Sequence, residues 1–91
     1  MKKAVKVIIS GSVQGVFFRG FIKEQADRLK IKGHVRNLED GKVEAWIEGD
    51  GKNVDQMIEI CKKGPPHGQI RRLDEIDEKF QGFTEFKILN I

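Results

Sequence analysis

The chain has 91 residues, of which 38% are hydrophobic and 34% are charged, and its net charge is +3. This length allows one domain with a two-layer core and excludes two domains, so we expect a single domain over residues 1–91. No stretch is long and apolar enough to form a membrane-spanning helix.

The first part of the chain predicts a strand, a turn and a helix. Residues 4–9 place Val5, Val7 and Ile9 on one face, as in a half-buried strand. After a turn over residues 11–19, apolar side chains recur at helical spacing through about residue 30. These side chains are Phe18, Ile22, Ala26 and Leu29.

The turn over residues 11–19 has the composition of an anion-binding loop. Gly11 and Gly15 let the backbone curl, and amide groups there can converge on an anion together with those that open a helix. The guanidinium of Arg19 adds a planar fork of donors suited to phosphate oxygens. The spacing matches neither a Walker loop nor a dinucleotide fingerprint. On these residues alone, a plain turn with a solvated arginine is an equally good interpretation.

A hairpin and a second helix follow the first helix. Residues 34–38 and 43–48 are strand-like, and the Asp-Gly dipeptide at 40–41 supplies the turn between them. Asn53, with Gln56 three residues later, predicts the cap of the second helix. The apolar stripe of this helix consists of Val54, Met57 or Ile58, and Cys61. A Gly-Pro-Pro sequence then ends it.

The periodicity of residues 69–80 favours a third helix, because Ile70, Leu73, Ile76 and Phe80 are spaced as in a helix. Residues 84–91 alternate and predict a strand. The order βαββαβ predicts an α+β, ferredoxin-like two-layer α/β sandwich, with two helices on one face of a mostly antiparallel sheet. A right-handed crossover puts the ends of the first and second strands at one edge, where Asn37 can face the turn.

The numbers and positions of cysteine and histidine limit which disulfides and metal sites the protein can form and in which cellular compartment we expect it. The single Cys61 cannot form an internal disulfide, and the chain begins without a signal peptide, so we expect a cytoplasmic protein. Cys61 shares the apolar stripe of its helix, which favours a buried thiol over a nucleophile. Two isolated histidines and one cysteine do not have metal-ligand spacing, so we expect neither a metal nor a cofactor.

A phosphate-binding turn beside an amide side chain limits the reaction class. Phosphoryl transfer depends mostly on positioning and charge stabilisation. A carboxylate leaving from an acyl phosphate needs no general acid and no covalent intermediate. Arg19 and the turn amides would hold the phosphoryl oxygens, and Asn37 would orient a water molecule for in-line attack.

Two segments of the sequence resemble the signatures of the acylphosphatases. The first comprises Gly11, Val13, Gln14, Gly15, Val16, Phe18 and Arg19. The second comprises Gly33, Val35, Arg36, Asn37, Gly41 and Val43, with Gly49 six residues later. The resemblance spans nearly the whole chain, and two signatures in this order are highly specific.

The resemblance implies a metal-free hydrolase of acyl phosphates. It gives Arg19 the role of binding phosphate and Asn37 the role of placing water. It also implies a phosphate cradle made by the amides of Gln14, Gly15, Val16, Phe17, Phe18 and Arg19. In addition, it implies that residues 69–80 are largely strand, against their periodicity.

Two positions depart from the family pattern. His34 stands where an aromatic residue is usual, and Ile22 stands where a hydroxyl-bearing residue is common. We expect His34 to cause the loss of a packing or rim contact rather than a change in chemistry. We expect Ile22 to affect the rigidity of the turn, and hence the rate rather than the reaction.

The expected partners are a small acyl phosphate and the product, inorganic phosphate, with no nucleic acid, no membrane and a monomeric state. Little in the sequence indicates a deep acyl pocket, so we expect broad specificity.

A rival interpretation is a nucleic-acid-binding module, motivated by a pI near 9.1 and by Trp46 as a stacking platform. Against it, such a tryptophan is more often covered by a terminal segment or simply exposed. A third is an inactive acyl- or carbamoyl-phosphate-binding module of a larger maturation protein, which the end of the chain at Ile91 disfavours.

Overall fold

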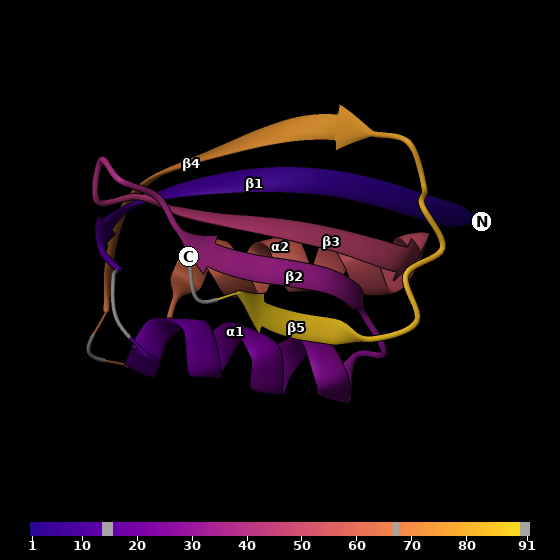
Figure 1. Ribbon diagram of the computed structural model, residues 1–91, viewed down its shortest axis with the longest axis horizontal. Coiled ribbons are helices and arrows are strands. Elements are labelled where there is room, and N and C mark those ends of the chain that lie inside the picture. Colours follow the sequence, from indigo (N-terminus) through magenta and orange to yellow (C-terminus); the bar gives the residue numbers. More distant parts are fainter. Residues whose placement is uncertain (14–15, 67, 90–91) are drawn as a thin grey trace.

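A five-stranded sheet with two helices packed on it makes up the described part of the chain, residues 1–13, 16–66 and 68–89 of a computed structural model (Figure 1). In chain order the elements are β1 (Lys2–Ser12), α1 (Val16–Arg28), β2 (Lys32–Asn37), β3 (Val43–Asp50), α2 (Gly51–Lys63), β4 (Gln69–Glu78) and β5 (Phe86–Leu89). Helix α1 packs on β2 and β5, and α2 packs on β1, β3 and β4. None of the helices in these ranges is long and apolar enough to cross a membrane.

The strand order β4-β1-β3-β2-β5 determines which ends of the strands meet. Strands β1 and β2 both run antiparallel to β3, and β5 runs parallel to β2. The carboxyl ends of β1, β2 and β5 therefore lie at one end of the sheet, together with the start of α1 (Figure 1). The α+β, ferredoxin-like class is confirmed, with a short fifth strand that makes the order βαββαββ.

Strand β4 corrects the helix that periodicity predicts over residues 69–80. The pairing of β1 with β4 is interrupted by a bulge between Ser10 and Gly11, where the partner changes from Arg72 to Ile70. Because a bulge shifts the alternation of side chains by one residue, Ile70 and Leu73 both pack against the core although they are three residues apart. The resemblance to the acylphosphatases predicted this strand correctly, and periodicity did not.

The core lies between the helices and the sheet face that they cover. Its members from the sheet and helices are fully or almost fully buried and include Val5, Val7, Ile9, Phe18, Ile22, Ala26, Val43, Ala45, Ile47, Val54, Met57 and Cys61. These are the alternating and helical stripes that the sequence predicts. Burial raises the pKa of the Cys61 thiol to about 12, so Cys61 is protonated at neutral pH and is not a nucleophile.

The start of α2 differs from the predicted cap at Asn53. Helix α2 begins at Gly51 with Asp50 in the cap position, and the Asp50 side chain makes no capping hydrogen bond. The reason is the pairing of Lys2 with Asp50, which holds β3 in register up to its last residue. The Gly51 amide then donates to the Met1 carbonyl at 2.7 Å, so Asn53 falls inside the first turn.

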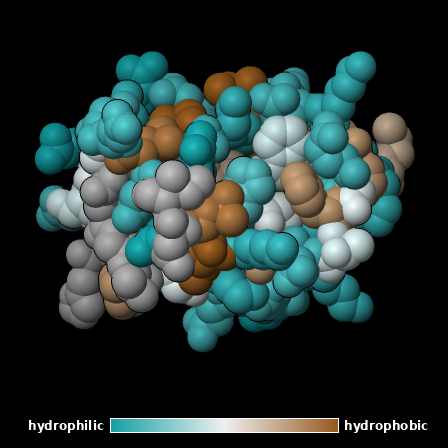
Figure 2. All heavy atoms as spheres, in the orientation of Figure 1, coloured by the Kyte–Doolittle hydropathy of each residue, from teal (hydrophilic) through white to brown (hydrophobic). Residues whose placement is uncertain are grey.

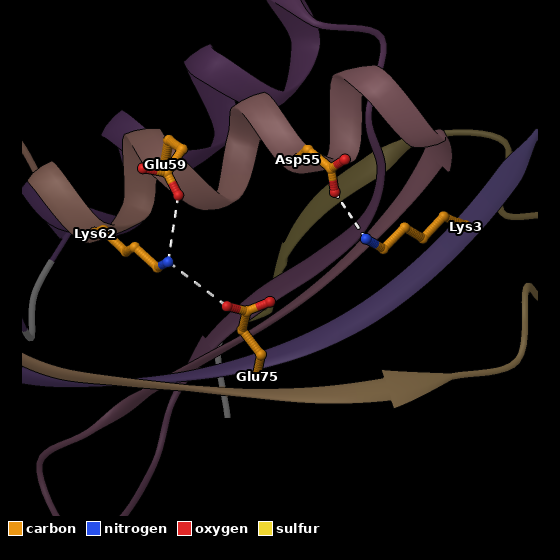
Figure 3. A network of polar contacts seen from close by, with 5 residues as sticks. All are labelled: Lys3, Asp55, Glu59, Lys62 and Glu75. Atoms are coloured by element: carbon orange, nitrogen blue, oxygen red, sulfur yellow. Dashed lines mark hydrogen bonds and ion pairs between the residues drawn. The ribbon is translucent and has the colours of Figure 1, made fainter.

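Ion pairs connect α2 to β1 and β4 (Figure 3). Lys3 Nζ lies 2.7 Å from Asp55, and Lys62 Nζ lies 3.3 Å from Glu59 and 3.7 Å from Glu75. The hydrogen bond from Lys3 to Asp55 raises the pKa of Lys3. These side chains are exposed, and exposed pairs contribute little to stability. Helix α2 is therefore held mainly by its buried stripe.

The other face of the sheet carries a buried carboxylate. Glu48 is fully buried, and its side chain accepts hydrogen bonds from Trp46 Nε1 at 2.9 Å, Gln81 N at 2.9 Å and Phe83 N at 2.8 Å. These bonds hold the segment between β4 and β5 against the sheet. The Trp46 ring packs edge-on against Phe83, with ring centroids 6.1 Å apart. Trp46 is therefore covered rather than presented as a stacking platform. Figure 2 shows this face as largely hydrophilic, with hydrophobic residues in small groups.

We expect Glu48→Gln to lower the free energy of unfolding by about 2–3 kcal/mol, because the new amide nitrogen would face an N–H donor in a buried site. Burial alone raises the pKa of Glu48, but the hydrogen bonds from Gln81, Trp46 and Phe83 outweigh it and the pKa is lowered. Ionised Glu48 therefore stabilises the fold at pH values above its ordinary pKa of 4.5. This stabilisation is lost as the pH falls through the lowered pKa of the folded state.

Urea unfolding measured at pH 7 and at successively lower pH tests this expectation for Glu48. The variant should lose part of the acid sensitivity of the parent protein. Glu39→Gln, at an exposed turn position, is the matched control and should change stability by less than about 0.5 kcal/mol. Equal effects of the two substitutions would contradict the role given to Glu48.

Candidate functional site

The candidate site lies where β1, β2 and β5 end and α1 begins. Arg19, in the first turn of α1, is 8% exposed, and its Nη1 donates to the Leu89 carbonyl at the end of β5 at 3.2 Å. Phe18 and Ile22 pack this turn onto the core. As a result, the guanidinium is fixed at the end of the sheet and is not a solvated charge.

The start of α1 supplies backbone donors at the same place. Val16, Phe17, Phe18 and Arg19 form its first turn, and the first amide groups of a helix have no acceptor within the helix. These groups form the positive end of the helix dipole. The remaining predicted cradle residues, Gln14 and Gly15, lie outside the described residues.

Gly11 has a different role from the one the sequence predicts. It is not part of the turn, because β1 continues to Ser12 through the bulge opposite β4. Its φ is +138°, and a Cβ there would collide with the Gln69 carbonyl oxygen. Glycine is required at this position for the close approach of two strands, so the strand-to-helix turn is shorter than expected.

Asn37 lies at the same end of the sheet as Arg19. It is the last residue of β2, and its Oδ1 is buried and has no hydrogen-bond partner among the described residues. The parallel pairing of β2 with β5 places Arg36 opposite Leu89, which is the residue that accepts from Arg19. Asn37 alternates with Arg36, so it lies on the same sheet face as the buried Val35, under α1. The structure thus brings the two predicted residues to the same end of the sheet.

The two positions that depart from the family pattern both have structural roles. Ile22 is fully buried in the core under α1. His34 lies on the opposite sheet face from Asn37 and contacts the rings of Trp46 and Phe83, with centroids 6.2 and 5.9 Å apart. Burial lowers the pKa of His34, with a smaller contribution from Arg36, while Glu44 opposes the shift. The imidazole ring therefore makes a packing contact at this position, and the expected loss of that contact is wrong.

The sequence did not indicate two features of the site. The Leu89 carbonyl orients Arg19, and a backbone oxygen has no side-chain signature. Arg36 is adjacent to Asn37 but pairs with Glu44 at 3.0 Å on the other face, so the site has one arginine on the helix side among the described residues.

Within residues 1–13, 16–66 and 68–89, no group of three His, Cys, Asp or Glu residues is placed to hold a metal ion.

In chemical terms, the arrangement combines a fixed cation, the backbone amides at the start of a helix and a buried side-chain acceptor. A cation and convergent N–H groups stabilise the oxygens of a tetrahedral or trigonal-bipyramidal oxyanion. A buried acceptor without a partner can accept a hydrogen bond from a water molecule. Together, these groups fit a phosphoryl group beside an ordered water.

Comparison with known proteins identifies the family. The Acylphosphatase family model matches residues 5–88. The chain is 46% identical over 80 residues to an acylphosphatase of Rubrobacter xylanophilus, covering 88% of this chain and 73% of that protein. It is 43% identical over 90 residues to an acylphosphatase of Syntrophus aciditrophicus, covering 98% of this chain and 94% of that protein. The crystal structure of acylphosphatase from Bacillus subtilis superposes with a TM-score of 0.91 at 32% identity, covering 99% of this chain and all of that one. The chain belongs to the acylphosphatase family.

Proposed function

We propose that the protein hydrolyses acyl phosphates, the mixed anhydrides of carboxylic and phosphoric acids, to a carboxylate and inorganic phosphate. One observation carries the proposal beyond family membership. The buried Arg19, fixed by the Leu89 carbonyl, shares one end of the sheet with the unpartnered Oδ1 of Asn37. A cation that binds a phosphoryl group and an acceptor that orients water are the two groups that this hydrolysis needs.

In the proposed ground state, the phosphoryl group lies at the amino end of α1. Its oxygens accept hydrogen bonds from amides of residues 14–19 and from the guanidinium of Arg19. Because charge on these oxygens is redistributed in the transition state, donors fixed in advance stabilise it without reorganisation. The core contacts of Phe18 and Ile22 supply that rigidity.

In the proposed reaction, a water molecule that donates a hydrogen bond to Asn37 Oδ1 attacks phosphorus in line with the leaving group. The new P–O bond forms as the bond from phosphorus to the acyl oxygen breaks, and the carboxylate leaves with that electron pair. The water proton passes to a phosphoryl oxygen of the substrate. Neither a metal nor a covalent enzyme intermediate takes part in this scheme, since a carboxylate is a good leaving group.

An assay with benzoyl phosphate and acetyl phosphate in the presence of a chelator tests this function. We expect rapid release of inorganic phosphate that is unaffected by the chelator. In oxygen-18-labelled water, one labelled oxygen should appear in phosphate and none in the carboxylate, because the scheme breaks the bond to phosphorus. Release no faster than in buffer would contradict the proposal. The cytoplasmic location and the monomeric state remain predictions.

A further inference from the structure

An apolar hollow lies on the solvent-facing side of α1, next to the proposed phosphate site. It has a volume of about 300 Å³ and is lined by Phe17, Gly20, Phe21 and Glu24. These residues are spaced i, i+3, i+4 and i+7 and so share one helix face. Phe17 is 66% exposed, the largest exposed fraction among the six phenylalanines of the chain. The hollow is open to solvent, so it can contact one side of a small apolar group without enclosing it.

The floor of this hollow is Gly20, where neither the backbone conformation nor a close contact requires glycine. Gly20 lies in the middle of a helix and not at positive φ, and a Cβ added there would meet no atom within 4 Å. Glycine at such a position is less favourable than alanine. Its one structural consequence is the open space between Phe17 and Phe21. Glycine at position 20 therefore makes the helix less stable than alanine would, and it leaves the hollow open.

The geometry of in-line displacement connects the hollow with the substrate. Asn37 lies on the sheet side of the amino end of α1, so a water molecule held there attacks from that side. The leaving carboxylate must then depart on the opposite side, away from β2. Gly20 and Glu24 lie on the helix face opposite the buried Ile22 and Ala26. A group that leaves on that side passes the first turn of α1, where the hollow begins at Phe17 in the same turn as Arg19.

We propose that this hollow binds the acyl group of the substrate and makes the protein selective for acyl phosphates with an uncharged apolar acyl group, such as an aryl group. This inference rests on the proposed function and replaces the broad specificity expected from the sequence. Phe17 and Phe21 provide ring faces and edges for an aryl group, and Gly20 provides the space.

Glu24 adds a charge criterion to the same hollow. It is exposed at the rim, four residues beyond Gly20 and therefore one helical turn farther from the phosphate. An acyl group that ends in its own carboxylate would bring like charges together there. The hollow thus disfavours dicarboxylic acyl phosphates relative to neutral ones of similar length.

The test compares kcat/KM for benzoyl phosphate, acetyl phosphate and succinyl phosphate in the parent protein and in variants. Gly20→Leu should lower the benzoyl-to-acetyl ratio about tenfold, since one apolar contact in a pocket is worth factors of this size. Glu24→Gln should raise the succinyl-to-benzoyl ratio about threefold. The dissociation constant of benzoylphosphonate, a stable analogue, should rise in Gly20→Leu relative to that of acetylphosphonate.

The matched control is Gln56→Leu, which adds an exposed leucine to α2 away from the site and should leave the benzoyl-to-acetyl ratio unchanged. Leucine favours helices, and circular dichroism will confirm that both variants fold. If the parent protein hydrolyses both substrates but the ratio in Gly20→Leu is the same as in the control, this inference is wrong and the proposed function stands. If the parent protein hydrolyses none of the three, the proposed function fails, and this inference fails with it.

Discussion

Arg19→Ala is expected to lower kcat/KM for acyl phosphates by about a thousandfold or more, because the substitution removes the cation that stabilises the transferred phosphoryl group. It should also weaken the inhibition by inorganic phosphate, since the same guanidinium binds the product. Arg19→Lys keeps the charge but loses the planar fork, so it should recover only a small part of the activity. Steady-state kinetics with phosphate as a competitive inhibitor measures both effects.

Arg28→Ala is the control for this experiment. Arg28 lies in the last turn of the same helix and is exposed, with a hydrogen bond to Gln25, so its loss should leave kcat/KM within about twofold of the parent value. Thermal unfolding separates a lost contact from a lost fold, because Arg19 also donates to the Leu89 carbonyl. A folded Arg19→Ala variant with full activity would contradict the proposed site.

Asn37→Ala should lower kcat by about a hundredfold while leaving the affinity for inorganic phosphate nearly unchanged. The reason is that Asn37 is proposed to position the attacking water and not the phosphoryl group. The buried Oδ1 has no hydrogen-bond partner among the described residues, so its removal breaks no contact described within the fold. Kinetics and phosphate binding by calorimetry together distinguish a positioning role for water from a role in substrate binding.

Asn53→Ala provides the comparison, because Asn53 lies in the first turn of α2 at the opposite end of the sheet. We expect this variant to behave as the parent protein does in both measurements. If Asn37→Ala instead loses phosphate affinity in proportion to kcat, Asn37 binds the phosphoryl group and the assignment of the water to it is wrong.

Local patterns in the sequence predicted most of the fold. Alternation identified β1 and β3, and the apolar stripe identified α2, because each of these elements buries one complete face. Prediction failed where a long-range contact decided the outcome. The bulge opposite Ile70 gave an edge strand the spacing of a helix, and the pairing of Lys2 with Asp50 moved the start of α2 away from Asn53.

The same distinction applies to the candidate site. Turn chemistry and the crossover rule were sufficient to propose that Arg19 and Asn37 meet, and the structure brings them to one end of the sheet. Their catalytic roles remain predictions. The sequence did not predict that Glu48 is buried, because a glutamate that alternates with buried residues normally indicates a solvent-facing position. Its burial depends on the segment that follows β4, which no local pattern reveals.

The contact of Arg19 with β5 makes the proposed site sensitive to motion at the edge of the sheet. Within the described residues, strand β5 spans Phe86–Leu89 and pairs with β2 alone. Short strands at the edge of a sheet open at a lower free energy than the centre of a domain. Detachment of β5 would break the hydrogen bond between the guanidinium and the Leu89 carbonyl while the central strands stay intact. Inactivation by mild denaturant should therefore precede global unfolding, and residual activity would report on fraying rather than on the population of unfolded chains.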